Sequence, residues 1–270
     1  MQKTFEKYTL EKRIKTMLSV DLRRAFTTPL YYLLVGISLV IPILILVMTT
    51  MVQSAPPTDQ NLSQPAMESF TNAWQILGTV SGNGQTNSSA MSMDLVSMCN
   101  INMMYFIIAV FVCVFVADDF RSGYAKNLFT VRAKKSDYVI SKSTVCFIGG
   151  ASMILAFAVG SIIGGKIAGL SFEMTGFNIF NLVCCVLSKA LLSSIFVAIF
   201  LTMSVIAKQR LWLSMILSFG VGMFLFNIAP MVSPLNSTLI NVILSFVGGV
   251  GFLAGLGAIS NIILNKTALI

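Results

Sequence analysis

The chain has 270 residues, of which 56% are hydrophobic and only 10% charged, and its mean hydropathy is +0.85. A soluble domain carries about 25% charged residues, so this composition excludes an ordinary water-soluble globule and an intrinsically disordered chain. There are 18 Lys and Arg, 10 Asp and Glu, and no histidine. The lack of histidine excludes a Ser-His-Asp triad, an HExxH zinc site and a histidine-ligated haem. We therefore expect a membrane protein that is not itself an enzyme, with no catalytic and no metal-binding residue.

Residues 1–29 are predicted to form a cytoplasmic amphipathic helix that lies at the membrane surface. Apolar side chains recur every four positions, which is the spacing of one helix face. These residues are Leu10, Ile14, Leu18, Leu22 and Phe26. Basic residues occupy the other faces, as in helices that bind a membrane interface.

Six apolar stretches follow, each long enough for the roughly 20 residues that a membrane span requires. They cover residues 30–52, 98–117, 143–169, 177–207, 211–228 and 238–264. The polar residues 53–97 contain no Lys or Arg, and we expect an extracellular loop there, with a short helix around Trp74. The predicted fold class is an all-α polytopic membrane protein with six transmembrane helices in residues 30–270.

Basic residues collect on one side of this predicted topology. Sixteen of the 18 lie in the N-terminal segment, in residues 118–142, in residues 208–210 or in the C-terminal tail. Because basic loops stay on the cytoplasmic side, both termini are expected to be cytoplasmic. The net charge of +8 then reflects topology, and no nucleic-acid partner is expected.

Lys189 is the one basic residue inside an apolar stretch. At a helix centre it costs about 2.5–3.5 kcal/mol on the insertion scale. We therefore expect the fourth span to cover residues 189–207, with residues 177–188 as an outer interfacial helix and Lys189 snorkelling to the surface. The functional alternative makes Lys189 a residue of the transport pathway.

Two glycine patterns are expected to serve helix packing. Residues 160–166 match the phosphate-loop pattern GxxxxGK, but an isoleucine follows the lysine and the match lies inside an apolar stretch. The pairs Gly160/Gly164 and Gly251/Gly255 are instead predicted to let helices approach closely. The chain contains no nucleotide-binding motif, so if it takes part in ATP-driven transport, ATP hydrolysis would fall to another chain.

Residues 118–142 form the most informative segment. Gly123 can end one turn, and residues 124–131 can form a short helix whose apolar and basic side chains suit a protein contact. The run Asp-Phe-Arg-Ser-Gly-Tyr-Ala-Lys-Asn-Leu, followed by Ser-Asp-Tyr-Val-Ile-Ser-Lys, resembles the loop between spans two and three of type-2 ABC transporter permeases. Asp119, Gly123 and Lys126 match that family's pattern, and Tyr124 replaces its usual Thr.

This resemblance extends to the N-terminal helix, the six spans and the cytoplasmic ends. In the family the loop is a coupling helix seated in a cleft of the ATPase subunit. The resemblance therefore implies ATPase-coupling residues in this chain. They are Asp119, Phe120, Arg121, Gly123, Tyr124, Lys126, Asn127, Leu128, Phe129 and Arg132. ATP and Mg would be bound by the partner ATPase, and this chain would carry no cofactor.

The resemblance implies the permease subunit of an ATP-driven ABC exporter in the bacterial cytoplasmic membrane. Two permease copies, as a homodimer or a related heterodimer, would work with two ATPase chains. The 16 Met and 20 Phe suit an adaptable apolar pathway, so we expect an amphipathic or hydrophobic substrate such as a peptide toxin, a bacteriocin or a drug. The alternatives are an ATP-independent secondary transporter or channel, a membrane-embedded enzyme, and an immunity protein that sequesters a toxin.

Overall fold

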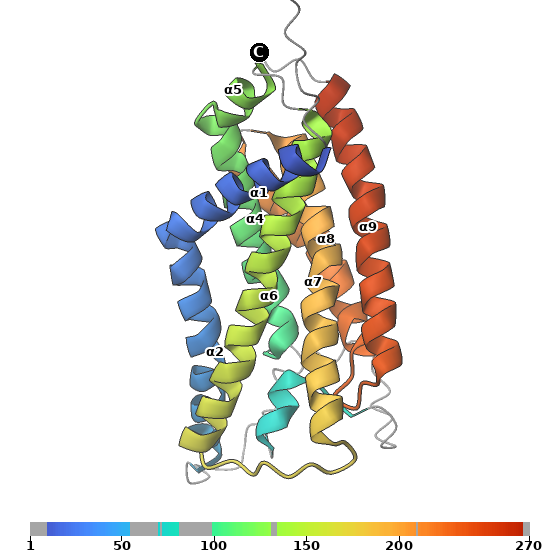
Figure 1. Cartoon of the computed structure of the whole chain (residues 1–270). Coiled ribbons are helices and arrows are strands. Elements are labelled where there is room, and N and C mark those ends of the chain that lie inside the picture. Colours follow the sequence, from blue (N-terminus) through green and yellow to red (C-terminus); the bar gives the residue numbers. More distant parts are fainter. Residues whose placement is uncertain are drawn as a thin grey trace, which may run out of the picture.

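A computed structural model describes residues 10–54, 70, 72–80, 99–130, 134–208 and 210–266, and these residues form a bundle of helices (Figure 1). In chain order the elements are α1 (Leu10–Thr27), α2 (Pro29–Ser54), η1 (Ala73–Leu77), η2 (Ile101–Met103), α4 (Met104–Arg121), α5 (Tyr124–Thr130), α6 (Lys135–Ile167), α7 (Ile179–Ala207), α8 (Leu211–Val232) and α9 (Leu239–Lys266). Within this described part there is no β-strand, and the prediction of an all-α polytopic membrane protein is confirmed.

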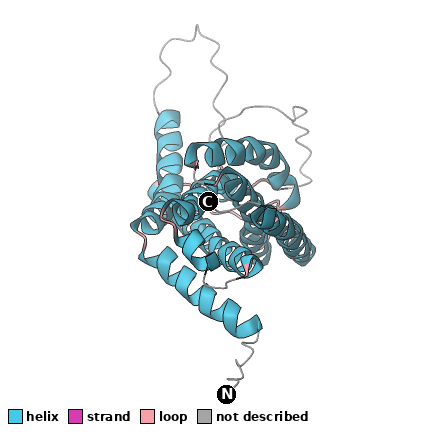
Figure 2. Ribbon diagram, turned by 90° about the horizontal axis from the view of Figure 1, so that it is seen from above, coloured by secondary structure: helices cyan, strands magenta, loops and turns pink. Residues whose placement is uncertain are grey.

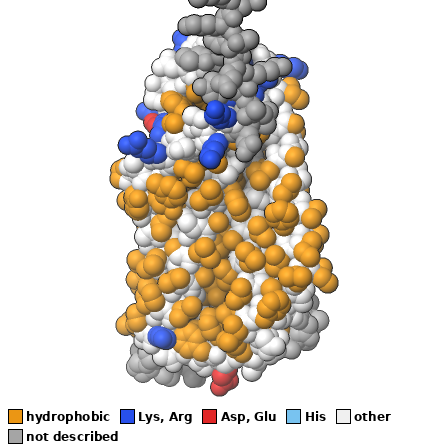
Figure 3. Space-filling view, in the orientation of Figure 1, with side chains coloured by type: hydrophobic (Ala, Val, Ile, Leu, Met, Phe, Trp, Pro, Cys, Tyr) orange, Lys and Arg blue, Asp and Glu red, His pale blue; other side chains and the backbone are white. Residues whose placement is uncertain are grey.

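Five of the described helices, namely α2, α4, α6, α7 and α9, are long and apolar enough to cross a membrane. The apolar part of α8 is shorter, Leu211–Phe226. The whole of α8 has 22 residues, and 1.5 Å per residue makes it about 33 Å long, so it matches the thickness of a bilayer core. On the face shown in Figure 3, apolar side chains cover the middle of the bundle, where lipid would contact it.

The two ends of the bundle differ in charge. Basic side chains gather at the end that carries α1 and α5, and we call this the basic end (Figure 3). The opposite end, where η1 lies, we call the outer end, because the positive-inside rule places the basic end in the cytoplasm. Viewed from the basic end, α1 lies lengthwise across the edge of the bundle, whereas the long helices run along the line of sight (Figure 2).

Helix α7 occupies the centre of the bundle and α9 its surface. In the most apolar window of α7, 78% of the residues are buried, against 11% in α9. The hydroxyls of Ser193 and Ser194 on α7 donate to the carbonyls of the preceding turn, so these two groups need no water. The lipid-facing character of α9 explains why its exposed side chains are almost all apolar.

The Gly160/Gly164 pair lies at a close contact between two long helices. A Cβ on Gly164 would lie 2.8 Å from the Cα of Ile43, and one on Gly160 would overlap the carbonyl oxygen of Leu39. The packing role predicted for this pair is confirmed, and α2 lies directly against α6. Residues 160–166 are helical throughout, so they form no phosphate-binding loop.

The Gly251/Gly255 pair behaves differently. A Cβ on either glycine would meet nothing within 4 Å, so no described helix of the same chain approaches this pair closely, and its predicted packing role stays a prediction. Gly249 makes the close contact instead, because a Cβ there would overlap the hydroxyl of Ser194 on α7. Gly249 and Gly251 are only two residues apart but lie on different faces of α9. The glycine motif alone does not indicate which of these faces packs against α7.

Several predicted boundaries shift. The expected loop 118–142 shrinks to residues 122–134, because α4 continues to Arg121 and α6 already begins at Lys135. The short helix predicted inside it is confirmed as α5. Helix α8 passes through Pro230 and ends at Val232 rather than at residue 228.

The expected arrangement of the fourth span is wrong. Helix α7 runs without a break from Ile179 to Ala207, so there is no separate interfacial helix before Lys189. The Lys189 side chain does not snorkel to the surface, because the residue is only 1% exposed. Its ammonium group finds polar partners on two other elements, Asn102 and Ser233, and this removes the reason for snorkelling.

The outer end is closed by the short helix η1. The capping box of Asn72 and Gln75 starts this helix, and Trp74 packs edge-to-face on Phe172. Ile76 and Leu77 are fully buried. The short helix expected around Trp74 is therefore present and fills the outer end of the bundle.

Candidate functional site

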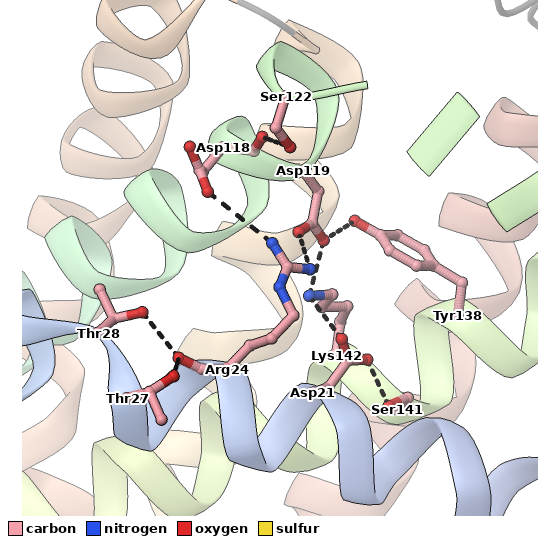
Figure 4. Close-up of polar contacts among 10 residues, drawn as sticks. All are labelled: Asp21, Arg24, Thr27, Thr28, Asp118, Asp119, Ser122, Tyr138, Ser141 and Lys142. Carbon is pink, nitrogen blue, oxygen red and sulfur yellow. Dashed lines mark hydrogen bonds and ion pairs between the residues drawn. The ribbon is translucent and has the colours of Figure 1, made fainter. Parts of the chain in front are cut away.

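A network of buried charges joins α1, α4 and α6 directly beside α5 (Figure 4). Its centre is formed by Asp21 of α1, Asp119 of α4 and Lys142 of α6, and all three residues are fully buried. Charged residues are almost never fully buried unless they are paired. Such a cluster at the end of a membrane bundle therefore marks a site that needs a specific geometry.

The Lys142 ammonium group lies between the two buried carboxylates. Its Nζ is 3.0 Å from Oδ1 of Asp21 and 2.7 Å from Oδ2 of Asp119. It also lies 3.9 Å from the centre of the Phe115 ring, which adds a cation–π contact. One side chain of α6 thus holds both α1 and α4.

Arg24 supplies the second positive charge of the network. Its Nη1 donates to Oδ1 of Asp119 at 2.8 Å, and its Nη2 lies 3.8 Å from Oδ2 of Asp118. The guanidinium carbon lies 4.0 Å above the ring of Tyr124 in α5. Burial acts to lower the pKa of Arg24, but the charge and hydrogen bond of Asp119 outweigh burial and raise that pKa above its usual value.

Two hydroxyl groups complete the shell around the carboxylates. Tyr138 donates to Oδ2 of Asp119 at 2.9 Å, and Ser141 donates to Oδ2 of Asp21 at 2.6 Å. The positive charges of Arg24 and Lys142 balance the negative charges of the two buried carboxylates, Asp21 and Asp119. A buried ion pair is tolerated only when such hydrogen bonds satisfy its remaining lone pairs, and removing one partner is strongly destabilising.

Helix α1 brings Asp21 to this position because its buried face is centred on that residue. Met17, Asp21 and Ala25 follow one another at intervals of four and are all buried. The predicted apolar face, which ended at Phe26, is displaced by about one residue, and Phe26 itself is 37% exposed. Tertiary contacts cause this displacement of the buried face. An acidic residue is stable on that face only when a cation pairs with it, and Lys142 of α6 provides this cation.

Helix α5 turns its apolar side toward the bundle. Ala125 is buried, and the Phe129 ring packs edge-to-face on Tyr138 with 5.5 Å between centroids. Gly123 has a φ of +73°, a left-handed conformation that glycine adopts easily, and this lets the chain turn from α4 into α5. Lys126 and Asn127 lie on the exposed side. The surface that α5 offers to a partner is therefore polar and basic.

A protein-family comparison identifies the chain. The family model described as ABC-2 family transporter protein matches residues 22–227. The chain belongs to the ABC-2 transporter family. Comparison with curated proteins and with solved structures gave no match. An ABC-2 protein is the membrane permease component of an ABC transporter, and the resemblance seen in residues 119–142 is thereby confirmed at the level of the family.

The match begins one residue after Asp21 and takes in the other parts of this ABC-2 permease that build the network, from the end of α1 through α4, α5 and α6. Family membership implies an ABC ATPase as partner. It also confirms that the chain is a transport component rather than a catalytic enzyme. The positive-inside rule predicts that the basic end, where α5 lies, faces the cytoplasm, and this orientation stays a prediction.

The residues predicted to couple this permease to an ATPase fall into three groups. Asp119 and Phe120 are buried inside the bundle. The half-buried residues are Gly123, Tyr124, Leu128 and Phe129, and the exposed ones are Arg121, Lys126 and Asn127. Arg132 lies outside the described residues. The coupling role of all these residues stays a prediction.

Sequence reasoning missed four residues of the network in this permease, namely Asp21, Arg24, Tyr138 and Lys142. Asp21 could have been found from its place on the α1 face, four residues after Met17 and four before Ala25. Lys142 follows Tyr138 by four residues, so the two share one face of α6, and both contact Asp119. Among the described residues no group of three or more Cys, Asp or Glu is arranged to hold a metal ion. The ion pairs of the site join α1, α4 and α6.

Proposed function

We propose that this permease is the membrane subunit of an ATP-driven exporter, and that its ATPase docks at the basic end on the exposed side of α5. The observation that carries this proposal is the position of α5, whose polar side faces out while its other side contacts the buried ion network. Tyr124 reaches the network through Arg24, and Phe129 reaches it through Tyr138. A partner that holds α5 would thus hold α1, α4 and α6 as well.

The mechanism follows from this connection. When the ATPases bind and hydrolyse ATP they change their separation, and α5 would move with them as part of a rigid unit. Because Lys142 and Arg24 pair with Asp119 across three helices, the ends of α4 and α6 and the whole of α1 would move together. Rigid-body rotation of packed helices is a common way to switch access between two sides of a membrane protein.

The substrate proposed is amphipathic or hydrophobic, such as a peptide toxin, a bacteriocin or a drug. The membrane-facing surface and much of the interior of the bundle consist of apolar side chains, and buried aromatic rings stack there, as for Tyr105 and Phe196 at 3.9 Å. The proposed assembly has two permease copies and two ATPase chains in the bacterial cytoplasmic membrane. The direction of transport that we propose for such an amphipathic, lipid-soluble substrate is export.

Co-purification with the partner ATPase tests the docking. The double variant Lys126→Glu/Asn127→Glu reverses charge on the exposed side of α5 without touching the buried network. We expect it to reduce association with the ATPase at least tenfold, whereas Lys166→Glu, an exposed lysine at the outer end, leaves association unchanged. Equal association of the ATPase with the wild type, the double variant and Lys166→Glu would contradict the proposed docking surface.

A further inference from the structure

The two fully buried lysines of this permease are neutralised to very different extents. Lys142 has two carboxylates within 3.0 Å. The Nζ of Lys189 is bonded only by neutral acceptors among the described residues, Oδ1 of Asn102 at 3.3 Å and Oγ of Ser233 at 3.1 Å. No described Asp or Glu lies within ion-pair distance of it. A buried cation without a countercharge is expensive, and an ionisable residue inside a membrane bundle is by default a functional candidate.

Lys189 lies toward the outer end. It is ten residues from the start of α7, which places it about 15 Å along that helix. Its two acceptors belong to short or terminal segments, since Asn102 is part of η2 and Ser233 is the C-cap of α8. The only described carboxylate at this end, Glu173, is exposed in the connection between α6 and α7.

A short segment covers Lys189 on the outer side. A Cβ on Gly78, directly after η1, would lie 3.9 Å from Cε of Lys189 and 4.0 Å from the carbonyl oxygen of Ser233. One backbone hydrogen bond, from the Leu235 N–H to the Thr79 carbonyl at 2.8 Å, ties this segment to the connection between α8 and α9. We call residues 73–79 the outer cap. The outer cap is a single short turn and is part of no long helix.

The wall next to Lys189 is aromatic and rigid. Tyr105 donates its hydroxyl proton to the Lys189 carbonyl oxygen at 3.2 Å, and its ring stacks on Phe196 with 3.9 Å between centroids. A ligand site typically combines apolar and aromatic walls with a few polar groups that fix orientation. One cation with two neutral hydrogen-bonding groups beside stacked rings suits an anionic headgroup joined to an apolar chain.

We propose that Lys189 binds the anionic group, a carboxylate or a phosphate, of an amphiphile that enters beneath the outer cap. The anion supplies the countercharge that Asn102 and Ser233 do not provide. As a statement about the exported substrate this rests on the proposed transport function, because it narrows the substrate class to anionic amphiphiles. The binding site itself needs neither the ATPase nor ATP.

Binding of dodecyl phosphate to the full chain in phosphatidylcholine nanodiscs tests the proposal, with dodecyl maltoside as the uncharged probe of equal chain length. We expect saturable binding of dodecyl phosphate to the wild type. Lys189→Met should raise its dissociation constant at least tenfold, Lys189→Arg should keep it within a few-fold, and neither should change the response to dodecyl maltoside. The exposed Lys166→Met at the same end is the matched control and should bind as the wild type does. Size-exclusion chromatography shows whether each variant is folded.

The proposal would be overturned if a folded Lys189→Met variant bound dodecyl phosphate with wild-type affinity. It would also be overturned if this variant lost affinity for dodecyl phosphate and for dodecyl maltoside equally. A second variant tests the entry route independently. The pair Thr79→Cys/Leu235→Cys can be oxidised to lock the outer cap, and we expect binding to be lost on oxidation and restored on reduction. Binding that persists in the oxidised form would show that the anion does not pass beneath the cap.

The source of the anion is decided in nanodiscs that contain phosphatidylglycerol. If this lipid competes with dodecyl phosphate in the wild type but not in Lys189→Met, the ligand is a lipid headgroup. If it does not compete, the ligand is a free amphiphile, and in both cases Lys189 is the anion site. Because no step uses ATP, this experiment can fail while the docking of the ATPase at α5 is upheld, and the reverse also holds.

Discussion

Replacing Lys142 with methionine is expected to loosen α1 from the bundle, because this lysine is the shared partner of two carboxylates that are fully buried. Its Nζ lies 3.0 Å from Asp21 and 2.7 Å from Asp119. Methionine has a similar length and leaves little cavity, so the change isolates the loss of charge. In the variant only Arg24 remains to balance two carboxylates.

The size of the effect follows from the cost of an unpaired buried charge. Breaking a buried ion pair by removing one partner costs about 3–5 kcal/mol. For a chain of this length about 2 °C of melting temperature corresponds to 1 kcal/mol, so the variant should melt about 6–10 °C below the wild type. The loss should be largest at α1, where Ser141 is the other described partner of Asp21.

Thermal unfolding in detergent and limited trypsin digestion measure this effect. Trypsin reports on α1 because Lys15 and Arg23 lie on its exposed sides, and we expect faster cleavage in Lys142→Met. The double variant Asp21→Asn/Lys142→Met leaves Arg24 and Asp119 as a balanced pair, so it should recover at least about 2 kcal/mol of the single variant's loss, within the range of coupling between contacting residues.

Lys126→Met is the matched control, since Lys126 is exposed on α5 and has no part in the network. Surface substitutions usually change stability by less than about 0.5 kcal/mol. The reasoning is refuted if Lys142→Met melts within a degree or two of this control, or if the double variant is no more stable than Lys142→Met alone.

Three further predictions concern packing, hydrogen bonding and pH. Gly164→Leu should lower the melting temperature by several degrees because α2 leaves no room for a side chain there, whereas Gly255→Leu, which faces open space, should change it by less than a degree or two; equal effects would contradict the packing. Tyr138→Phe removes a hydrogen bond to a buried carboxylate and should cost about 1.5–3 kcal/mol in thermal unfolding, and a neutral outcome would show that this bond contributes nothing. Burial, with the charge of Asp21, raises the pKa of Tyr124 above its usual value, so the unfolded chain loses this proton first and stability falls as the pH rises beyond about 10. The melting temperature of Tyr124→Phe should fall less steeply than that of the wild type over this range, and identical slopes would contradict the shift.

The sequence predicts the parts of the fold that depend on local pattern. Scarce charge and long apolar stretches predict a multi-pass helical membrane protein, and the glycine before Tyr124 predicts the turn into α5. The Gly160/Gly164 pair predicts a close helix contact, and α2 provides it. Each of these signals is contained in a few neighbouring residues.

The parts that were missed depend on partners far apart in the chain. Asp21 and Lys142 are separated by 121 positions, and without Lys142 an aspartate on the buried face of α1 has no explanation. Lys189 was expected at the surface because its acceptors, Asn102 and Ser233, are 87 and 44 positions away. In the sequence, a charged residue at the edge of an apolar stretch indicates the end of a helix. In this structure the helices continue past such residues, whose side chains find polar partners inside the bundle.

The central claim, that an ATPase docks on the exposed side of α5, is tested most directly by chemical protection of Asn127→Cys. The native cysteines interfere little, since four of the five are buried and Cys99 lies at the outer end. In inside-out vesicles a membrane-impermeant maleimide should label Asn127→Cys rapidly when the permease is alone and at least tenfold more slowly when the partner ATPase is bound. Lys166→Cys should be labelled only from the opposite side of the membrane and should be indifferent to the ATPase. Undiminished labelling of Asn127→Cys in a complex shown to contain the ATPase would contradict the account.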